Sequence, residues 1–367
     1  MQILANRQGI SFKGLRVAMR SGLRIAHEEA RPPVSDANIC KVPAARDAVA
    51  FPQGFGQRFV LTVDTEEEFN WDAPLERSSH SLVTVPVLRK FQQFCEGHSV
   101  VPIYLLDYPV AKSTTASEAL GDAVAAGRAE IGVQLHPWVS PPFDEELTAF
   151  NSFAGNLPAE LEREKFTQLH SLIADNFGAR PRIYRAGRYG VGPQTAAILA
   201  EAGIRIDTSV RPNFDYSYEG GPNFREHPLR PYWLDREAGL LEMPLTSVYW
   251  GPLRNLGGAI YPLLWRAPSV RGALARGRLL ERIPLTPEGI TVNEAIRAID
   301  VAIDDGLPLL VFSFHSPSLA PGHTPYVRRP EDLDDFYDWW RRIFAYLEQR
   351  KIAPASVGDI LGALSLA

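Results

Sequence analysis

From Phe55 onward, short β-rich runs alternate with helical stretches, and this alternation is the strongest constraint on the fold. Strand–helix alternation builds βαβ units around a parallel sheet, and apolar strands such as 309–312 suit a sheet covered on both faces. The pattern predicts strands over 58–63, 100–106, 130–135, 182–184, 204–207 and 307–314, and helices over 84–95, 116–126, 158–177, 194–202, 292–304 and 332–350. We therefore expect an α/β fold, either a barrel or a doubly wound sheet. No Gly-rich phosphate loop follows the first strand, which disfavours dinucleotide binding.

Two segments stand outside this alternation. Residues 1–54 are predicted to form an N-terminal extension, in which 12–30 have the pattern of a basic amphipathic helix for a membrane surface or a partner. A peripheral helix and a misplaced start codon are the alternatives. Residues 55–367 are predicted to form the main domain, whose irregular insertion near 211–287 either shapes a substrate cleft or covers a barrel edge.

Composition narrows the class of protein. Hydrophobic residues make up 45% of the chain, which is ample for a core, and a net charge of −5 argues against a nucleic-acid partner. Cys40 and Cys95 form no C-x-x-C pair, so neither a disulfide framework nor a cysteine zinc site is indicated. No apolar run approaches the roughly 18 residues of a membrane span, and the N-terminus lacks a signal-peptide pattern. These features predict a cytoplasmic protein without a transmembrane segment.

Residues with catalytic chemistry collect where the predicted strands end, which is the face on which parallel barrels build their sites. Asp64 and Glu66 follow the first strand two residues apart, so their side chains point the same way if the strand continues. Two adjacent carboxylates are costly unless a cation lies between them or one is protonated. We interpret the pair as a general base beside a metal ligand, with a solvated acidic loop as the alternative.

Two later strand ends carry an imidazole and guanidinium groups. His136 follows a strand, between Gln134 and Trp138, and imidazole is a common zinc ligand, although a lone histidine is more often structural. Arg185 and Arg188 follow the next strand. A guanidinium fork binds a carboxylate or phosphate, or orients a catalytic aspartate, and a turn with two surface arginines is the alternative.

Asp207 and His315 complete the set of polar strand ends. His315 ends the most apolar strand of the chain, where an imidazole acts as a general acid or serves as a core histidine. Together the strand ends match the needs of metal-assisted hydrolysis. These are an ion that polarises a carbonyl and activates water, a base for the water proton, and an acid for the leaving amine.

In their order along the chain, these motifs resemble those of the polysaccharide deacetylase family, also called the NodB-homology family. The resemblance runs from about Phe55 to the C-terminus and rests on the segments 62–66, 130–136, 184–189, 207–209 and the strand that ends at His315. The residues of segments 62–69 and 134–138 are similar to those of a bacterial subgroup of the WalW type. This subgroup is linked to cell-surface polysaccharide and lipopolysaccharide biosynthesis. The resemblance implies a distorted (β/α) barrel of about seven parallel strands, with 55–367 as a deacetylase-like catalytic domain.

The implied activity is hydrolytic removal of acetyl groups from an N-acetylated or O-acetylated sugar or polysaccharide precursor. For an N-acetyl group, the bond that is hydrolysed is a carbon–nitrogen bond other than a peptide bond. By resemblance, Asp64 is the base, Arg185 holds it, and His315 is the acid. A divalent metal ion, commonly zinc, binds the acetyl oxygen and the attacking water. The residues predicted to bind substrate are Trp71, Trp138, Arg188, Tyr189 and Asp207, and Phe69 and Trp250 are further candidates for apolar contacts with sugar rings.

The sequence departs from the family at the metal site. Thr65 stands where a second aspartate is usual, and Glu66 is predicted to substitute for it. The usual pair of histidines four residues apart is reduced to His136, with Ser140 four residues on, and Gln134 aligns with the first histidine. The predicted ligands are Glu66, His136 and Gln134, with Asp64 as an alternative to Gln134, a set richer in oxygen than usual.

This departure keeps two other functions open. One is a hydrolase of small cyclic amides that works without metal. The other is a catalytically silent, carbohydrate-binding member of the family.

Overall fold

The computed structural model describes residues 37–70, 73–78, 80–264 and 267–365, all within one compact unit, residues 35–367. The predicted helix over 12–30 and the predicted substrate contact Trp71 lie outside the described residues. None of the described helices is long and apolar enough to cross a membrane.

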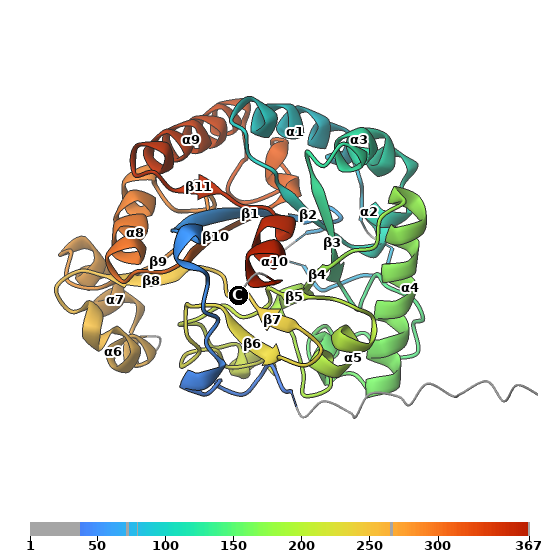
Figure 1. Cartoon of the computed structure of the whole chain (residues 1–367), viewed down its shortest axis with the longest axis horizontal. Helices are drawn as coiled ribbons and strands as arrows, with labels where there is room; N and C mark the ends of the chain where they lie inside the picture. Colours follow the sequence, from blue (N-terminus) through green and yellow to red (C-terminus); the bar gives the residue numbers. More distant parts are fainter. Residues whose placement is uncertain (1–36, 71–72, 79, 265–266, 366–367) are drawn as a thin grey trace, which may run out of the picture. The chain divides into compact units, whose positions relative to one another are not determined.

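A nine-stranded sheet forms the centre of the unit, in the order β10-β1-β2-β3-β4-β5-β7-β6, with β11 added beside β1 (Figure 1). Every pair from β10 to β7 is parallel, and β6 is antiparallel at the edge. The strands are β1 (Arg58–Thr65), β2 (Ile103–Leu106), β3 (Glu130–Leu135), β4 (Ile183–Ala186), β5 (Ile206–Asp207), β6 (Tyr232–Asp235), β7 (Leu240–Glu242), β10 (Leu309–His315) and β11 (Ala353–Pro354). The predicted barrel-type α/β fold is confirmed.

Helices surround the curled sheet, as the strand–helix alternation predicts (Figure 1). They are α1 (Leu88–Gly97), α2 (Tyr108–Lys112), α3 (Thr114–Ala125), α4 (Ala159–Phe177), α5 (Thr195–Glu201), α8 (Val292–Asp304), α9 (Pro330–Gln349) and α10 (Val357–Ser365). All six predicted helices are present. The short helices α2 and α10 were not predicted, because each is too brief to show a helical period in the sequence.

Alternation along β1 separates two cores. Phe59, Leu61 and Val63 face outward into the larger apolar cluster under the helices, whereas Val60 belongs to a second cluster inside the barrel. Thr62 and Asp64 follow Val60 on the inward face, because successive side chains of a strand point to opposite sides. The barrel interior is therefore apolar at the amino ends of the strands and polar at their carboxyl ends.

Helix α10 closes the amino end of the barrel. Val357 and Ile360 belong to the inner apolar cluster, and the carboxylate of Glu130 accepts hydrogen bonds from the backbone N–H groups of Val357 and Gly358 at 2.6 and 3.1 Å. Because this end is covered, the interior is reached from the carboxyl ends of the strands.

The insertion near 211–287 contains β6 and β7, followed by an antiparallel ribbon and a helical excursion. The ribbon pairs β8 (Ser247–Trp250) with β9 (Glu281–Pro284), and the excursion holds α6 (Gly257–Leu264) and α7 (Pro268–Arg276). Residues next to the ribbon bond to β10: Thr246 N–H donates to Val311 O at 3.3 Å, and Ser313 N–H donates to Leu285 O at 3.2 Å. The ribbon therefore lines the gap between β10 and β7.

The described part of the N-terminal extension packs against the same unit. Ile39 is fully buried, and its carbonyl lies 3.1 Å from Nε2 of His227. Val49 N–H donates to the carbonyl of Pro231 at 2.9 Å. Residues 37–54 thus cover the β6 edge of the sheet.

Glu162 on α4 makes the stability of the fold depend on pH. Its side chain is 1% exposed and accepts hydrogen bonds from Thr195 Oγ1 at 2.5 Å and Gln194 Nε2 at 2.6 Å. Burial raises the pKa of this carboxyl to about 7 despite those hydrogen bonds. The carboxyl of Glu162 therefore loses its proton at a lower pH in the unfolded chain than in the folded protein. As the pH rises from about 4.5 to about 7, the contribution of Glu162 to the free energy of unfolding falls.

We expect Glu162→Gln to gain stability relative to the wild type by roughly 3 kcal/mol between pH 4 and pH 8, because the glutamine has no proton to lose. Urea unfolding of both proteins at the two pH values measures this gain. Glu164→Gln, an exposed neighbour on α4, is the control and should show no such change. A stability difference between wild type and Glu162→Gln that is the same at both pH values would contradict the prediction.

Candidate active site

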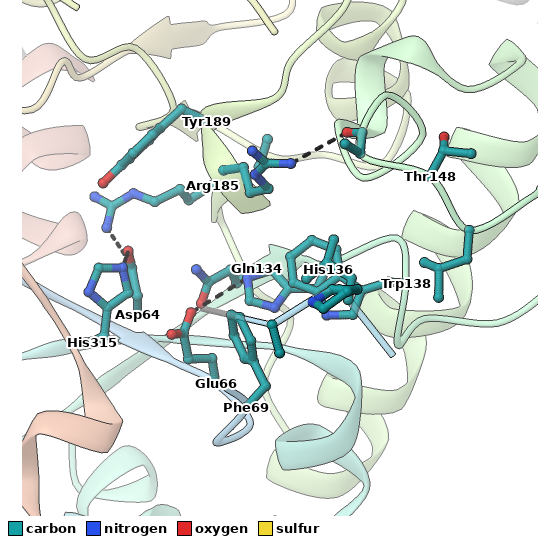
Figure 2. Close-up of a pocket in the computed structure, with 17 residues that line it drawn as sticks. Asp64, Glu66, Phe69, Gln134, His136, Trp138, Thr148, Arg185, Tyr189 and His315 are labelled. Atoms are coloured by element: carbon teal, nitrogen blue, oxygen red, sulfur yellow. Dashed lines mark hydrogen bonds and ion pairs between the residues drawn. The ribbon is translucent and has the colours of Figure 1, made fainter. Parts of the chain in front are cut away.

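A cavity of about 520 Å³ opens at the carboxyl ends of the parallel strands (Figure 2). The strand ends supply Asp64, Glu66, Gln134, His136, Arg185 and His315, and the loops after them supply Phe69, Trp138, Arg188 and Tyr189. The structure thus brings together all the residues predicted from the sequence to act in catalysis or as metal ligands.

Strand register explains this convergence. Asp64 lies directly beside His315 on the β1–β10 pair, and Gln134 lies beside Arg185 on the β3–β4 pair. All four side chains lie on the inward face of their strands. Residues more than 200 positions apart in sequence therefore become neighbours at one edge of the sheet.

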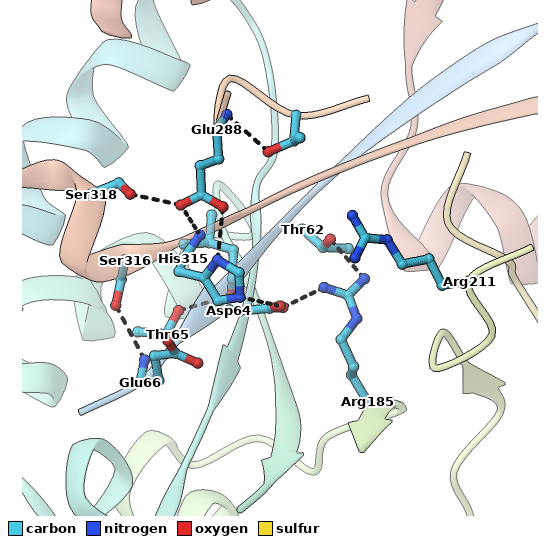
Figure 3. Close-up of polar contacts among 12 residues, drawn as sticks. Thr62, Asp64, Thr65, Glu66, Arg185, Arg211, Glu288, His315, Ser316 and Ser318 are labelled. Carbon is cyan, nitrogen blue, oxygen red and sulfur yellow. Dashed lines mark hydrogen bonds and ion pairs between the residues drawn. The ribbon is translucent and has the colours of Figure 1, made fainter. Parts of the chain in front are cut away.

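Asp64 is held by a buried ion pair. Nη1 of Arg185 bonds to Oδ1 of Asp64, and Nη2 donates to Thr62 Oγ1 at 2.9 Å (Figure 3). Nε of Arg185 donates to the carbonyl of Thr208 at 3.0 Å, so the guanidinium is fixed on three sides. This leaves Oδ2 of Asp64 directed at His315, whose Nε2 lies 3.8 Å away.

A carboxylate that the sequence analysis missed orients His315. Oε2 of Glu288 lies 2.7 Å from Nδ1 of His315, and Oε1 accepts hydrogen bonds from the His315 backbone N–H at 3.1 Å and Ser318 Oγ at 2.6 Å (Figure 3). Burial lowers the pKa of His315, but the charges of Glu288 and Glu66 outweigh it and raise the pKa to about 10. His315 is therefore a cation whose Nδ1 donates to Glu288 and whose Nε2 faces Asp64.

Two further carboxylates that the sequence analysis did not single out, those of Glu67 and Asp107, hold His136 in place. Its Nδ1 lies 3.0 Å from Oε2 of Glu67, and Glu67 Oε1 accepts from Trp138 Nε1 at 2.8 Å. Asp107 Oδ2 accepts from the backbone N–H of Glu67 at 2.7 Å. With the Glu67 carboxylate accepting a hydrogen bond from Nδ1–H, Nε2 is the acceptor nitrogen of the ring, and it faces Glu66 Oε2 at 3.5 Å.

A close backbone approach fits His136 into this position. A Cβ at Gly187 would lie 2.4 Å from Cδ2 of His136, so only glycine permits the ring to lie there. The ring of Trp138 stacks on the His136 ring, with the ring centroids 4.3 Å apart.

Two groups of side chains have the chemistry to bind a cation. Ligand atoms of Glu67, Asp107 and His136 lie within 4.8 Å of one another. The carboxylates of Glu67 and Asp107, however, already accept hydrogen bonds from Trp138, from His136 and from backbone N–H groups, and they lie behind His136. We therefore assign them to holding the imidazole.

The second group faces the cavity and consists of Glu66, His136 and Gln134 (Figure 2). Oε1 of Gln134 is buried and has no hydrogen-bond partner among the described residues. Burial raises the pKa of Glu66 to about 8, although the imidazoles of His315 and His136 lower it. A buried carboxyl, an unpartnered amide oxygen and an imidazole nitrogen that face one space are donors that suit a divalent cation.

The residues predicted to bind substrate are placed differently from one another. Tyr189 and Arg188 line the cavity, and Nη1 of Arg188 donates to Ser152 Oγ. Trp138 also lines it but is only 2% exposed, and its indole N–H is used by Glu67. Its main contacts are therefore with His136 and Glu67.

Asp207 does not reach the cavity, which corrects its assignment as a substrate contact. It is fully buried, accepts a hydrogen bond from Ser209 Oγ at 2.6 Å and lies beside Glu242 in the register of β5 and β7. On the two-residue strand β5, the preceding residue, Ile206, faces the barrel interior. Because successive side chains of a strand point to opposite sides, Asp207 points outward. Trp250 does not line the cavity either. Its ring packs against Arg297, whose guanidinium carbon lies 4.2 Å from the ring centroid of Trp250.

Comparison with known proteins gave matches among solved structures only, since no family model and no curated protein matches the sequence. A protein of Mycobacterium smegmatis described as a polysaccharide deacetylase has 15% identity and a TM-score of 0.45, over 86% of this chain and 98% of its own. One of Pseudomonas aeruginosa PAO1 with the same description has 12% identity and a TM-score of 0.46, over 86% and 93%. A CE4 family pseudoenzyme of Bacillus anthracis has 8% identity and a TM-score of 0.37, over 82% and 63%.

The chain is similar to polysaccharide deacetylases. This similarity concerns the fold alone. The WalW-type subgroup stays a prediction.

Proposed function

We propose that this chain is a metal-assisted hydrolase that removes acetyl groups from an N-acetylated or O-acetylated sugar of cell-surface polysaccharide metabolism. The observation that carries the proposal is the pairing of a fixed carboxylate with a fixed imidazolium. Asp64 Oδ2 faces His315 Nε2 at 3.8 Å, next to the three donors Glu66, His136 and Gln134. The WalW-like subgroup and the cytoplasm are parts of this proposal that come from the sequence.

The two fixed groups supply the proton transfers of amide hydrolysis. Asp64 accepts a proton from a water molecule while the water oxygen forms a bond to the acetyl carbonyl carbon. His315 then donates its Nε2 proton to the sugar nitrogen as the carbon–nitrogen bond breaks, which yields acetate and a free amine. Arg185 keeps Asp64 in place, and Glu288 keeps His315 charged and oriented.

In this proposal Glu66, His136 and Gln134 hold a divalent ion, with zinc the first candidate. When bound, the ion polarises the acetyl carbonyl and lowers the pKa of water. Glu67 prepares His136 for this role, because a hydrogen bond at Nδ1 leaves Nε2 as the coordinating nitrogen.

Release of acetate from acetylated sugars tests the function. Purified protein supplied with zinc or manganese is incubated with N-acetylglucosamine oligomers and, separately, with acetylated xylan. Equal amounts of acetate and new amine from the first substrate, or acetate alone from the second, would support the proposal. Sugar binding without acetate from either would contradict it and favour the silent carbohydrate-binding protein. Full activity after exhaustive chelation would favour metal-free amide hydrolysis.

We expect the wild type to retain about one divalent ion per chain and His136→Ala to lose it, since the imidazole is the only nitrogen donor in the proposed set. Elemental analysis after gentle purification measures the ion, and the melting temperature with and without chelator gives a second readout. His323→Ala is the control, because His323 does not line the cavity. Equal metal content in wild type and His136→Ala would refute this assignment of the ligands.

A further inference from the structure

A second cavity, of about 620 Å³, lies in the insertion, between helix α6, the β8–β9 ribbon and the loop that begins at Arg211. Its wall contains three arginines and several aromatic rings, and neither the proposed catalytic groups nor the proposed metal ligands take part in it. The residues used below are Arg211, Phe214, Asp215, Arg225, Leu263 and Arg282.

Two of the arginines share one aromatic ring. Cζ of Arg282 lies 3.5 Å from the ring centroid of Phe214, and Cζ of Arg211 lies 3.9 Å from the same centroid. Nη1 of Arg282 donates to the carbonyl of Asn213 at 2.6 Å, and Nη1 of Arg211 donates to Tyr216 Oη at 3.2 Å. These contacts use one guanidinium nitrogen of each arginine and hold both cations against the ring.

The cavity carries an excess of positive charge. Its one acidic residue, Asp215, pairs with Arg225 at 3.5 Å. Neither Arg211 nor Arg282 forms an ion pair with a carboxylate of the described part of the chain. Both side chains are half-buried, and burial lowers the pKa of Arg282. Two neighbouring cations in such a place repel each other unless an anion lies between them or beside them.

The surrounding sequence strengthens this charge pattern. Between Glu242 and Glu281 the chain has no acidic residue and contains five arginines, although the net charge of the whole protein is −5. Tyrosines 216, 249 and 261 add aromatic faces with polar tips to the wall of the cavity. Guanidinium forks match the oxygens of a carboxylate or a phosphate, and aromatic faces match the apolar face of a sugar ring.

The second cavity adjoins the candidate active site. The ring of Tyr189, which lines the active-site cavity, stacks on Tyr216 with centroids 5.5 Å apart, and Cζ of Arg211 lies 5.2 Å from the Tyr189 centroid. A wall of two rings and one guanidinium thus separates the two cavities. One saccharide of two or more units is long enough to lie across such a wall.

We propose that this second cavity binds an anionic group of a sugar, a phosphate or a carboxylate, through Arg211 and Arg282. The substrate class of the active site is then an acetylated saccharide that also carries negative charge. The statement about the substrate rests on the proposed function, whereas anion binding in the cavity does not.

The experiment is calorimetric titration of the purified protein with three matched sugars. These are glucose 1-phosphate, glucuronic acid and uncharged glucose, in low-salt buffer. We expect at least one anionic sugar to bind at least tenfold more tightly than glucose, and the better of the two identifies the anionic group. The proposal would be overturned if all three sugars bound equally well, or if none of them bound.

Two variants locate the site. Arg282→Gln should weaken binding of the anionic sugar at least tenfold, whereas Arg236→Gln should not, since Arg236 lies 5.3 Å from the Trp233 ring in a similar pair outside the cavity. Leu263 lines the cavity and is 74% exposed, so Leu263→Glu adds a negative charge without disturbing the core. It should weaken binding relative to Leu263→Gln. Unchanged affinity in both Arg282→Gln and Leu263→Glu would overturn the proposal even if the wild type binds.

Failure of this proposal is distinguishable from failure of the proposed function. Asp64→Asn should bind the anionic sugar as the wild type does, because Asp64 lines only the first cavity. A wild type that binds anionic sugars but releases acetate from no substrate would refute the deacetylase and retain the anion site. A wild type that releases acetate but binds anionic and uncharged sugars equally well would refute the anion site and retain the deacetylase.

Discussion

Replacement of Asp64 by asparagine is expected to lower acetate release by about 10²- to 10⁴-fold, the usual effect of losing a positioned general base. The asparagine keeps the shape of the side chain and an oxygen for Arg185, but it cannot accept the water proton. The expected change is in kcat more than in KM, because the lost interaction belongs to the reaction step. Steady-state kinetics on the best acetylated substrate, with the fold checked by circular dichroism, measures it.

The matched control for this substitution is Asp305→Asn. Asp305 also pairs with an arginine, Arg254, at 3.2 Å, but both side chains are substantially exposed and neither lines the cavity. It should keep wild-type activity. Acetate release by Asp64→Asn equal to that of Asp305→Asn would exclude Asp64 as the base.

Replacement of Arg185 by methionine is expected to lower the free energy of unfolding by roughly 3–5 kcal/mol, because it leaves the buried carboxylate of Asp64 without its partner. Asp64 and Arg185 are 2% and 0% exposed. The substitution also removes donors from Thr62 Oγ1 and from the carbonyl of Thr208. Urea unfolding of the two proteins measures the loss.

Two further variants test the cause of this destabilisation. Arg254→Met breaks the exposed pair with Asp305 and should cost less than about 1 kcal/mol. The double variant Asp64→Leu, Arg185→Met should recover part of the stability lost in Arg185→Met, since no buried charge remains. Wild-type stability of Arg185→Met would show that the pair is not needed to hold the barrel together.

The same ion pair shows how far sequence reasoning reached. Asp64, Arg185 and His315 were predicted to act together because each follows an apolar strand, and parallel strands carry their polar ends to one edge of the sheet. The predicted metal ligands Glu66, His136 and Gln134 face the same cavity for the same reason. The error at Asp207 arose on a strand of two residues, too short for its phase to be read from the pattern.

The residues that sequence reasoning missed support others from a distance along the chain. Glu288 reaches His315 from 27 positions away, and Glu67 reaches His136 from 69. Glu67 was visible in the acidic run after the first strand, but only the fold shows that it lies behind the imidazole while Glu66 lies in front. Glu288 follows none of the strands predicted from the sequence, because β9 (Glu281–Pro284) was not predicted, so its sequence context carried no signal.

The sequence by itself determined the strand–helix alternation, the order of the strand-end motifs and the inward phase of the polar residues on the longer strands. Those features are local, because side-chain period and strand propensity act over a few residues. The tertiary structure alone decided which carboxylates hold the two histidines and which arginines gather around Phe214. These depend on distances between segments far apart in the chain, which are set only when the helices and the insertion pack around the sheet.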